Sequence, residues 1–198
     1  MRRKIGIWLL LLLFVGAAQA QEEKLPSLLK ETKSGKVMFS SEKAKEEMKL
    51  QRLAQDRAVW AKWGGKPCPV FSLTDLNGRL WSNESVRGKV TLINFWQVTG
   101  GPCMREIPWL NKLCEKYPEL NFLACTLNDA AQVKAALAKV PFLFCQLTDA
   151  LPLWHAFGIV IVPTAILLNS KGNVQAVFTG TNDSLKREVE DRLKELEE

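Results

Sequence analysis

The sequence has little of what metal and haem sites require. Its 198 residues include one histidine and one tyrosine, and no two of the five cysteines are spaced as CxxC. Zinc and haem sites usually take paired cysteine or histidine ligands, so we expect no metal and no bound cofactor. An odd number of cysteines also prevents complete internal pairing. At least one thiol must therefore stay free, react, or pair with another chain.

Long apolar runs are equally scarce. The clearest one lies at the N-terminus, in MRRKIGIWLLLLLFVGAAQAQ, where three basic residues precede a short apolar block. This order predicts a secretory signal peptide over residues 1–20, with Ala18-Gln19-Ala20 as its cleavage site. An uncleaved membrane anchor is the alternative, although the block is short for a span of about twenty residues. We expect an exported, periplasmic or otherwise extracytoplasmic protein with no stable membrane insertion after cleavage.

The charge of the chain does not point to a nucleic-acid partner. Its formal net charge is +6, and half of this lies in the three basic residues of the predicted signal peptide. Residues 21–63 are charged and lysine-rich, and no strand is expected among them. A helix is predicted over residues 40–63, where Leu50, Leu53 and Trp60 recur at helical spacing. We interpret it as a linker or a helix lying on the domain, with a partner-binding helix as the alternative.

Residues 64–198 alternate between strand-like and helix-like segments. Asn77-Gly78, within residues 71–82, predicts a hairpin, and VTLINFW at 90–96 predicts a strand buried on both faces. Helices are expected at about 102–117, 129–139, 149–157 and 184–198, and further strands at 121–127, 142–147, 164–169 and 173–178. The pattern predicts an α/β fold, with a central mixed sheet flanked by helices and antiparallel strands added by a hairpin at each end.

The segment FWQVTGGPC joins the strand at 90–96 to the next helix. In that helix Cys103 begins an inward-facing stripe at helical spacing, which continues through Ile107, Leu110, Cys114 and Tyr117. A helix N-terminus favours a thiolate at Cys103, whereas an apolar environment raises the pKa of the thiol. The residue pattern leaves open which of the two effects is larger.

Four segments together resemble the TlpA/ResA-like branch of extracytoplasmic thioredoxin-fold thiol–disulfide oxidoreductases. They are the predicted signal peptide, GKPCPVFSLTDLNGRLWS, GKVTLINFWQVTGGPCMREIPWLNKL and FGIVIVPTAILLNSKG. The resemblance covers residues 64–198 and implies a thioredoxin-like fold with an N-terminal β-hairpin and an inserted helix and strand. Relatives typically read FWATWCGPC, so Gly100 stands where they have the exposed nucleophilic cysteine. Cys103 matches their second, more buried cysteine, and Gly101 and Pro102 complete the remnant of the motif.

The resemblance also implies roles outside this motif. Pro163 matches a cis-proline that packs beside the active site and pairs with bound peptide. Val162, Pro163 and Trp96 are therefore the candidate peptide-binding residues, although Trp96 at the end of a buried strand also fits a scaffold role. Glu106 matches a carboxylate that handles protons in many relatives. A solvated helix glutamate is the alternative for Glu106.

Thiol–disulfide exchange needs an attacking thiolate and a second thiol that resolves the mixed disulfide. With Gly100 in the first position, the resemblance implies at most an atypical monothiol activity of Cys103 toward a protein or peptide thiol or disulfide. The alternative is a redox-inactive peptide- or protein-binding module of the cell envelope, acting as a chaperone or adaptor. A peroxidase is disfavoured, because Thr99 lies four positions before Cys103 rather than three.

The remaining cysteines suggest structural roles, with one exception. Cys68 replaces a small residue of the family's GKPAP segment, and we expect it at the surface as a free thiol or in an intermolecular disulfide. Cys114 is expected to act as a small hydrophobe on its helix. Cys125 and Cys145 fall in strands and are expected to be inert, with a Cys125–Cys145 disulfide as the alternative. His155 is expected at the surface.

Overall fold

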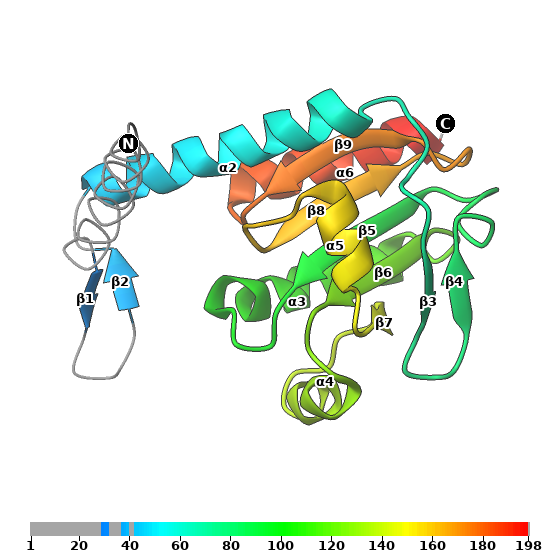
Figure 1. The fold of residues 1–198 in the computed structure, drawn as a ribbon, viewed down its shortest axis with the longest axis horizontal. Helices are drawn as coiled ribbons and strands as arrows, with labels where there is room; N and C mark the ends of the chain where they lie inside the picture. The colour runs from blue at the N-terminus through cyan, green and yellow to red at the C-terminus, as the bar shows by residue number, and fades with distance from the viewer. Residues whose placement is uncertain (1–28, 32–36, 40–41, 198) are drawn as a thin grey trace, which may run out of the picture. The chain divides into compact units, whose positions relative to one another are not determined.

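The computed structural model describes residues 29–31, 37–39 and 42–197 (Figure 1). The predicted signal peptide lies outside these residues. The chain divides into two compact units, Met1–Gln51 and Arg52–Glu198. Among the described residues, no helix is both long enough and apolar enough to cross a membrane.

The first unit contains two short strands that the sequence does not predict. β1 (Leu29–Glu31) pairs antiparallel with β2 (Val37–Phe39). The expectation of no strand between residues 21 and 63 is therefore wrong. Each strand is only three residues long, too short to show an alternating pattern within a charged segment. The helix predicted over 40–63 is confirmed as α2 (Glu42–Trp63), which begins in this unit and ends in the second.

A five-stranded mixed sheet forms the centre of the second unit, in the order β7-β6-β5-β8-β9. The first three strands in this order are parallel to one another. β8 runs antiparallel to β5, and β9 runs antiparallel to β8. Every residue of β5, β6 and β8 is buried, as expected of strands covered on both faces. The strands are β5 (Thr91–Trp96), β6 (Asn121–Thr126), β7 (Cys145–Leu147), β8 (Thr164–Leu168) and β9 (Val174–Thr179).

Helices cover both faces of this sheet and enclose two hydrophobic clusters (Figure 1). Side chains of α3, α4 and α6 pack on one face, in the cluster that contains Cys103. Side chains of α5, the hairpin and the last turns of α2 pack on the other face. The predicted α/β fold, a central mixed sheet flanked by helices, is confirmed. The helices of this unit are α3 (Gly101–Lys116), α4 (Ala130–Leu137), α5 (Leu151–Phe157) and α6 (Asp183–Glu197).

The N-terminal hairpin does not extend the central sheet. β3 (Ser72–Thr74) and β4 (Leu80–Ser82) pair only with each other, and a single bridge joins Asp75 to Leu147 of β7. The expectation that a hairpin at each end adds strands is thus wrong at this end and correct for β8 and β9. Trp81 is buried in the core on the α5 side of the sheet, so the hairpin covers a sheet face instead of prolonging its edge.

The strand expected at 142–147 is shorter than predicted and begins only at Cys145. Its first half bonds to a side chain of α3 instead of to β6. Asn111 donates to the carbonyl of Pro141 at 2.8 Å and accepts the N–H of Leu143 at 2.9 Å. The Asn111 amide thus supplies the hydrogen bonds that a neighbouring strand would otherwise make. The alternating apolar residues of this segment are buried although the segment is not a strand.

Candidate functional site

The site lies where β5 ends and α3 begins. The Gly100 N–H donates to the Gln97 carbonyl at 3.0 Å and closes the turn between β5 and α3. The Met104 N–H donates to the Gly100 carbonyl at 3.0 Å, and this is the first hydrogen bond of α3. A neighbouring loop supports this turn, since Asn128 accepts the Val98 N–H at 3.1 Å. The junction is thus held by backbone bonds that do not depend on the side chain at position 100.

Cys103 is a buried thiol in the first turn of α3, with 1% of its surface exposed. Burial raises the pKa of Cys103 to about 11, and the charge of Glu106 adds to the rise, while the backbone at Gln97 and Cys103 and the charge of Arg105 lower it. The question left by the sequence is thereby answered: desolvation outweighs the helix terminus. At neutral pH Cys103 is a thiol, and only a small fraction is thiolate.

Gly100 lies directly against this sulfur and carries no side chain there. A Cβ built on Gly100 would lie 2.9 Å from Cys103 Sγ, 3.4 Å from Cys103 Cβ and 3.2 Å from the Gln97 carbonyl oxygen. In a disulfide, the Cβ of one cysteine lies about 3 Å from the sulfur of the other, given an S–S bond of about 2.05 Å. Positions 100 and 103 therefore have the geometry of a disulfide pair from which one side chain is missing.

Glu106 lies on the same buried face of α3. Only 6% of its surface is exposed, and Oε2 has no hydrogen-bond partner among the described residues. Burial raises the pKa of Glu106 to about 8, and Lys186 lowers it in part. The alternative of a solvated helix glutamate does not describe this environment. A carboxyl group near neutral pKa, electrostatically coupled to Cys103, can hold or release a proton in the physiological pH range.

The candidate peptide-binding residues lie beside this junction. The Val162–Pro163 peptide bond is cis, and Pro163 precedes Thr164, which pairs with Phe95 of β5. By the antiparallel register, Pro163 therefore lies next to Trp96, the last residue of β5. Val162 is half-buried and packs against the cluster containing Cys103. Trp96 is fully enclosed, which fits the scaffold role and leaves it no surface for a peptide.

The position of Cys68 differs most from the sequence-based prediction, which placed its thiol at the surface. Only 3% of its surface is exposed, and burial raises the pKa of its thiol to about 12. Its backbone is held on both sides, since the Cys68 N–H donates to Gly172 and its carbonyl accepts from Asn83. Cys68 is therefore buried inside the domain, and the predicted surface position is wrong. The intermolecular disulfide through Cys68 stays a prediction.

All five cysteines are free thiols. Cys125 is fully buried and lies opposite Leu147, whereas Cys145 lies opposite Leu123, so the register offsets the two cysteines by two residues. The Cys125–Cys145 disulfide offered as an alternative is absent. Cys114 is half-buried against the core, and His155 is exposed as predicted. Among the described residues no group of three or more side chains could hold a metal ion.

Two polar residues that support the site are missed by sequence reasoning. Asn128 carries a signal that could have found it, because Asp129 and Gln132 form a capping box and Asn128 immediately precedes that helix start. Gln55 carries none: it is one polar residue on a charged helix, and its buried position depends entirely on how α2 packs.

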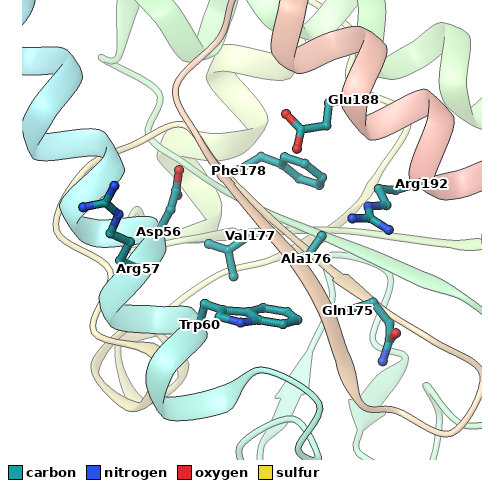
Figure 2. Close-up of a pocket in the computed structure, with 9 residues that line it drawn as sticks. All are labelled: Asp56, Arg57, Trp60, Gln175, Ala176, Val177, Phe178, Glu188 and Arg192. Carbon is teal, nitrogen blue, oxygen red and sulfur yellow. The ribbon is translucent and has the colours of Figure 1, made fainter.

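A groove of about 270 Å³ lies away from this chemistry (Figure 2). Figure 2 shows it over β9, between Trp60 of α2 and Arg192 of α6. It includes none of the candidate catalytic or peptide-binding residues. The chemical candidates are therefore confined to the junction at Cys103 and the loop before Pro163.

Comparison with known proteins agrees with this geometry. The redoxin family profile matches residues 64–193. The chain is 30% identical over 135 residues to the thioredoxin-like protein YneN of Bacillus subtilis, covering 65% of this chain and 78% of YneN. It is 30% identical over 132 residues to the thiol-disulfide oxidoreductase ResA of Geobacillus thermodenitrificans, covering 64% and 76%. A solved thiol:disulfide interchange protein, DsbE of Chlorobium tepidum, is 25% identical with a TM-score of 0.63, covering 67% and 96%.

The sheet order, the strand-to-helix junction and the cis-proline loop define a protein of the thioredoxin fold. The chain belongs to the redoxin family, in its TlpA/ResA-like branch of thiol–disulfide oxidoreductases.

Proposed function

We propose that this protein is an exported, extracytoplasmic member of its family in which Cys103 is the single active-site thiol and Gly100 replaces the nucleophilic cysteine. The observation that carries the proposal is the missing side chain at Gly100, where an added Cβ would lie 2.9 Å from Cys103 Sγ. The sulfur of a partner can occupy the space that a second cysteine fills in a dithiol site. Export rests on the predicted signal peptide.

The proposed reaction is thiol–disulfide exchange with a protein or peptide partner. The Cys103 thiolate attacks one sulfur of the partner's disulfide, a Cys103–partner S–S bond forms, and the second sulfur leaves as a thiolate that takes up a proton. A further thiol, supplied by the partner, then attacks the mixed disulfide and releases Cys103. Electrons balance because each S–S bond that forms replaces one that breaks. Without a resolving cysteine at position 100, the cycle depends on the partner for its second thiol.

Glu106 regulates the thiolate in this scheme. Its negative charge raises the pKa of Cys103, so the thiolate forms more readily while Glu106 is neutral. Burial keeps the pKa of Glu106 at about 8, and the carboxyl is therefore mostly protonated at pH 7. Holding this proton limits the rise in the pKa of Cys103, although the value of about 11 still predicts slow exchange.

The test is the reaction of the reduced protein with a cysteine peptide activated as a mixed disulfide with thionitrobenzoate. We expect release of the coloured thiolate and one peptide adduct, located at Cys103 by mass spectrometry. The rate should rise about tenfold per pH unit below pH 10, following the thiolate fraction. Cys103→Ser is the matched control and should form no adduct at the junction. Adducts confined to the half-buried Cys114 and Cys145 would contradict the proposal and favour the redox-inactive binding module.

Export is tested separately, by the N-terminus of the protein recovered from cells. We expect a mature chain that begins at Gln21, after the predicted cleavage site. A chain that retains residues 1–20 would contradict cleavage, and its distribution between membrane and soluble fractions would decide whether the segment anchors it.

A further inference from the structure

Gln55 of α2 is a buried polar residue that bonds to the loop before Pro163. Only 7% of its surface is exposed. Its Oε1 accepts two backbone N–H groups, those of Val160 and Ile161, both at 2.8 Å. Its Nε2 donates to the Ile161 carbonyl at 3.1 Å. One side-chain amide therefore takes the place of a strand partner for two consecutive residues of this loop.

The same amide joins the loop to the sheet. Gln55 Nε2 also approaches the Thr164 hydroxyl of β8 at 2.8 Å and the Thr179 hydroxyl of β9 at 2.9 Å. Thr164 in turn donates to the Ile161 carbonyl at 2.7 Å. All the polar atoms in this group are thereby satisfied inside the protein, and such saturated buried networks fix one conformation because partial satisfaction is costly.

The loop that Gln55 holds includes candidate peptide-binding residues of the site. Val162 packs against the hydrophobic cluster that contains Cys103, and Pro163 follows it in the cis conformation. Val160 has 83% of its surface exposed, although its backbone N–H is bound to Gln55. The backbone of the loop is thus held by Gln55, while the apolar side chain of Val160 is exposed two residues before Val162.

We propose that Gln55 is a positioning residue for the Val160–Pro163 loop, and that α2 thereby forms part of the site that receives a partner polypeptide. The inference rests on the proposed function, in which the partner approaches Cys103 past this loop. It extends the site beyond residues 64–193, the part of the chain that matches the redoxin profile. Gln55 acts through the loop and does not touch the reacting sulfur.

The test compares two substitutions at Gln55 with one at Val59. Gln55→Met has a similar size and removes every hydrogen bond, whereas Gln55→Glu keeps an acceptor for the two loop N–H groups. Val59→Ala is the control for loosened helix packing, because Val59 is buried on the same helix and belongs to the apolar cluster. Each protein is reacted with the activated cysteine peptide and, in parallel, with methyl methanethiosulfonate, which is too small to need the loop.

Gln55→Met should lower the rate with the peptide about tenfold through a higher KM, the size expected for losing one or two hydrogen bonds. Its rate with methyl methanethiosulfonate should change less than about twofold. Gln55→Glu keeps the acceptor but loses the Nε2 donor, so it should recover only part of the peptide rate. Amide exchange at Val160 and Ile161 should quicken most in Gln55→Met. Equal losses with both reagents, or the same peptide defect in Val59→Ala, would overturn the positioning role.

The Gly100→Cys background separates this inference from the proposed function. If Cys103 of the wild type reacts with neither reagent, the monothiol proposal fails. The Gln55 variants are then compared for reduction of the peptide disulfide by the dithiol that Gly100→Cys creates. The same tenfold loss in Gln55→Met, with partial recovery in Gln55→Glu, supports the positioning role. An unchanged rate there overturns it, whatever the wild type does.

Discussion

Two regions of the second unit each contain a buried thiol and a buried carboxyl group. The pKa of the carboxyl group differs between the two regions. At the junction, Cys103 lies near Glu106; under the hairpin, Cys68 lies in the same apolar cluster as Trp81, whose indole N–H bonds Asp75. Glu106 and Asp75 are almost equally inaccessible, with 6% and 7% of their surfaces exposed. Yet the pKa of Glu106 rises to about 8, whereas the pKa of Asp75 is held below its ordinary value.

Hydrogen bonds, together with the charge of Arg79, hold the pKa of Asp75 below its ordinary value against the effect of burial. Burial raises the pKa of both groups, but Asp75 accepts the indole N–H of Trp81 at 3.0 Å and the backbone N–H groups of Asn77 and Arg79 at 2.8 and 3.0 Å. Glu106 has an oxygen with no partner among the described residues. A carboxyl with this many donors stabilises a fold, and one left without them is suited to exchange a proton.

The largest expected effect adds a second sulfur at the junction. Gly100→Cys should form an intramolecular disulfide with Cys103 and raise reduction of a peptide disulfide by more than about a hundredfold over the wild type, because the resolving thiol is then intramolecular. The backbone at Gly100, with φ −76° and ψ 99°, lies in the extended region that L residues adopt. The measurement is the rate of peptide-disulfide reduction with a recycling thiol, together with the oxidised mass.

Gly101→Cys is the matched control for that change. A Cβ at Gly101 would meet Arg105 Nη1 at 3.3 Å, whereas the one at Gly100 meets Cys103 Sγ. The control should gain neither the disulfide nor the activity. If Gly100→Cys stays reduced in oxidised glutathione while Gly101→Cys closes a disulfide, the assignment of position 100 is wrong.

Much of the junction could be predicted from sequence, because it is local. The stripe that begins at Cys103 follows from helical spacing, and Ile107, Leu110 and Tyr117 are indeed buried. The half-exposed Cys114 departs from it, since Leu113 fills the core position instead. Local spacing gives the face of a helix to within about one residue.

The remaining features depend on contacts between distant segments. The depth of Cys68 is set by bonds to Gly172 and Asn83, neither of which its sequence neighbours reveal. The unpaired oxygen of Glu106 depends on which helices close over α3. Gln55 is bonded to residues more than 100 positions away, at Val160 and Ile161. Such partners become adjacent only when the sheet forms, so periodicity and spacing cannot identify them.

The second effect is the dependence of stability on the ionisation of Glu106. A pKa raised from 4.5 to about 8 means that the folded state binds this proton more tightly than the unfolded state. Its stabilising contribution is complete below about pH 4.5 and is lost as pH rises through about 8. Glu106→Gln removes this titration. Between pH 4.5 and 9 the free energy of unfolding of the variant should therefore rise by roughly 3–5 kcal/mol relative to that of the wild type. Urea unfolding at several pH values measures this, and parallel curves would contradict it.

A third effect separates the two buried thiols. Burial raises the pKa of Cys103 to about 11 and that of Cys68 to about 12. The lower pKa implies a larger thiolate fraction at Cys103 at a given pH. Native alkylation with iodoacetamide, followed by peptide mapping, should therefore modify Cys103 before Cys68. Labelling of Cys68 first would mean that the hairpin opens more readily than the junction.

The smallest effect tests the hydrogen bond that distinguishes Asp75 from Glu106. Trp81→Phe keeps a buried aromatic ring and removes the indole donor, which should cost about 1–2 kcal/mol at pH 7. Trp154→Phe is the matched control, because the Trp154 N–H is buried and has no partner among the described residues, so its loss breaks no hydrogen bond. Urea unfolding of the two variants should show the larger loss in Trp81→Phe.

The pH dependence of that loss makes the test specific to the carboxylate. The lowered pKa of Asp75 means that its stabilising contribution is present above the unfolded pKa near 3.8 and is lost as pH falls through the lower folded value. Without the Trp81 donor the pKa of Asp75 in the folded state should rise. The difference in the free energy of unfolding between Trp81→Phe and the wild type should therefore narrow on acidification. A gap that stays constant from pH 7 to pH 2 would mean that ring packing, and not the carboxylate bond, accounts for the difference between the two regions.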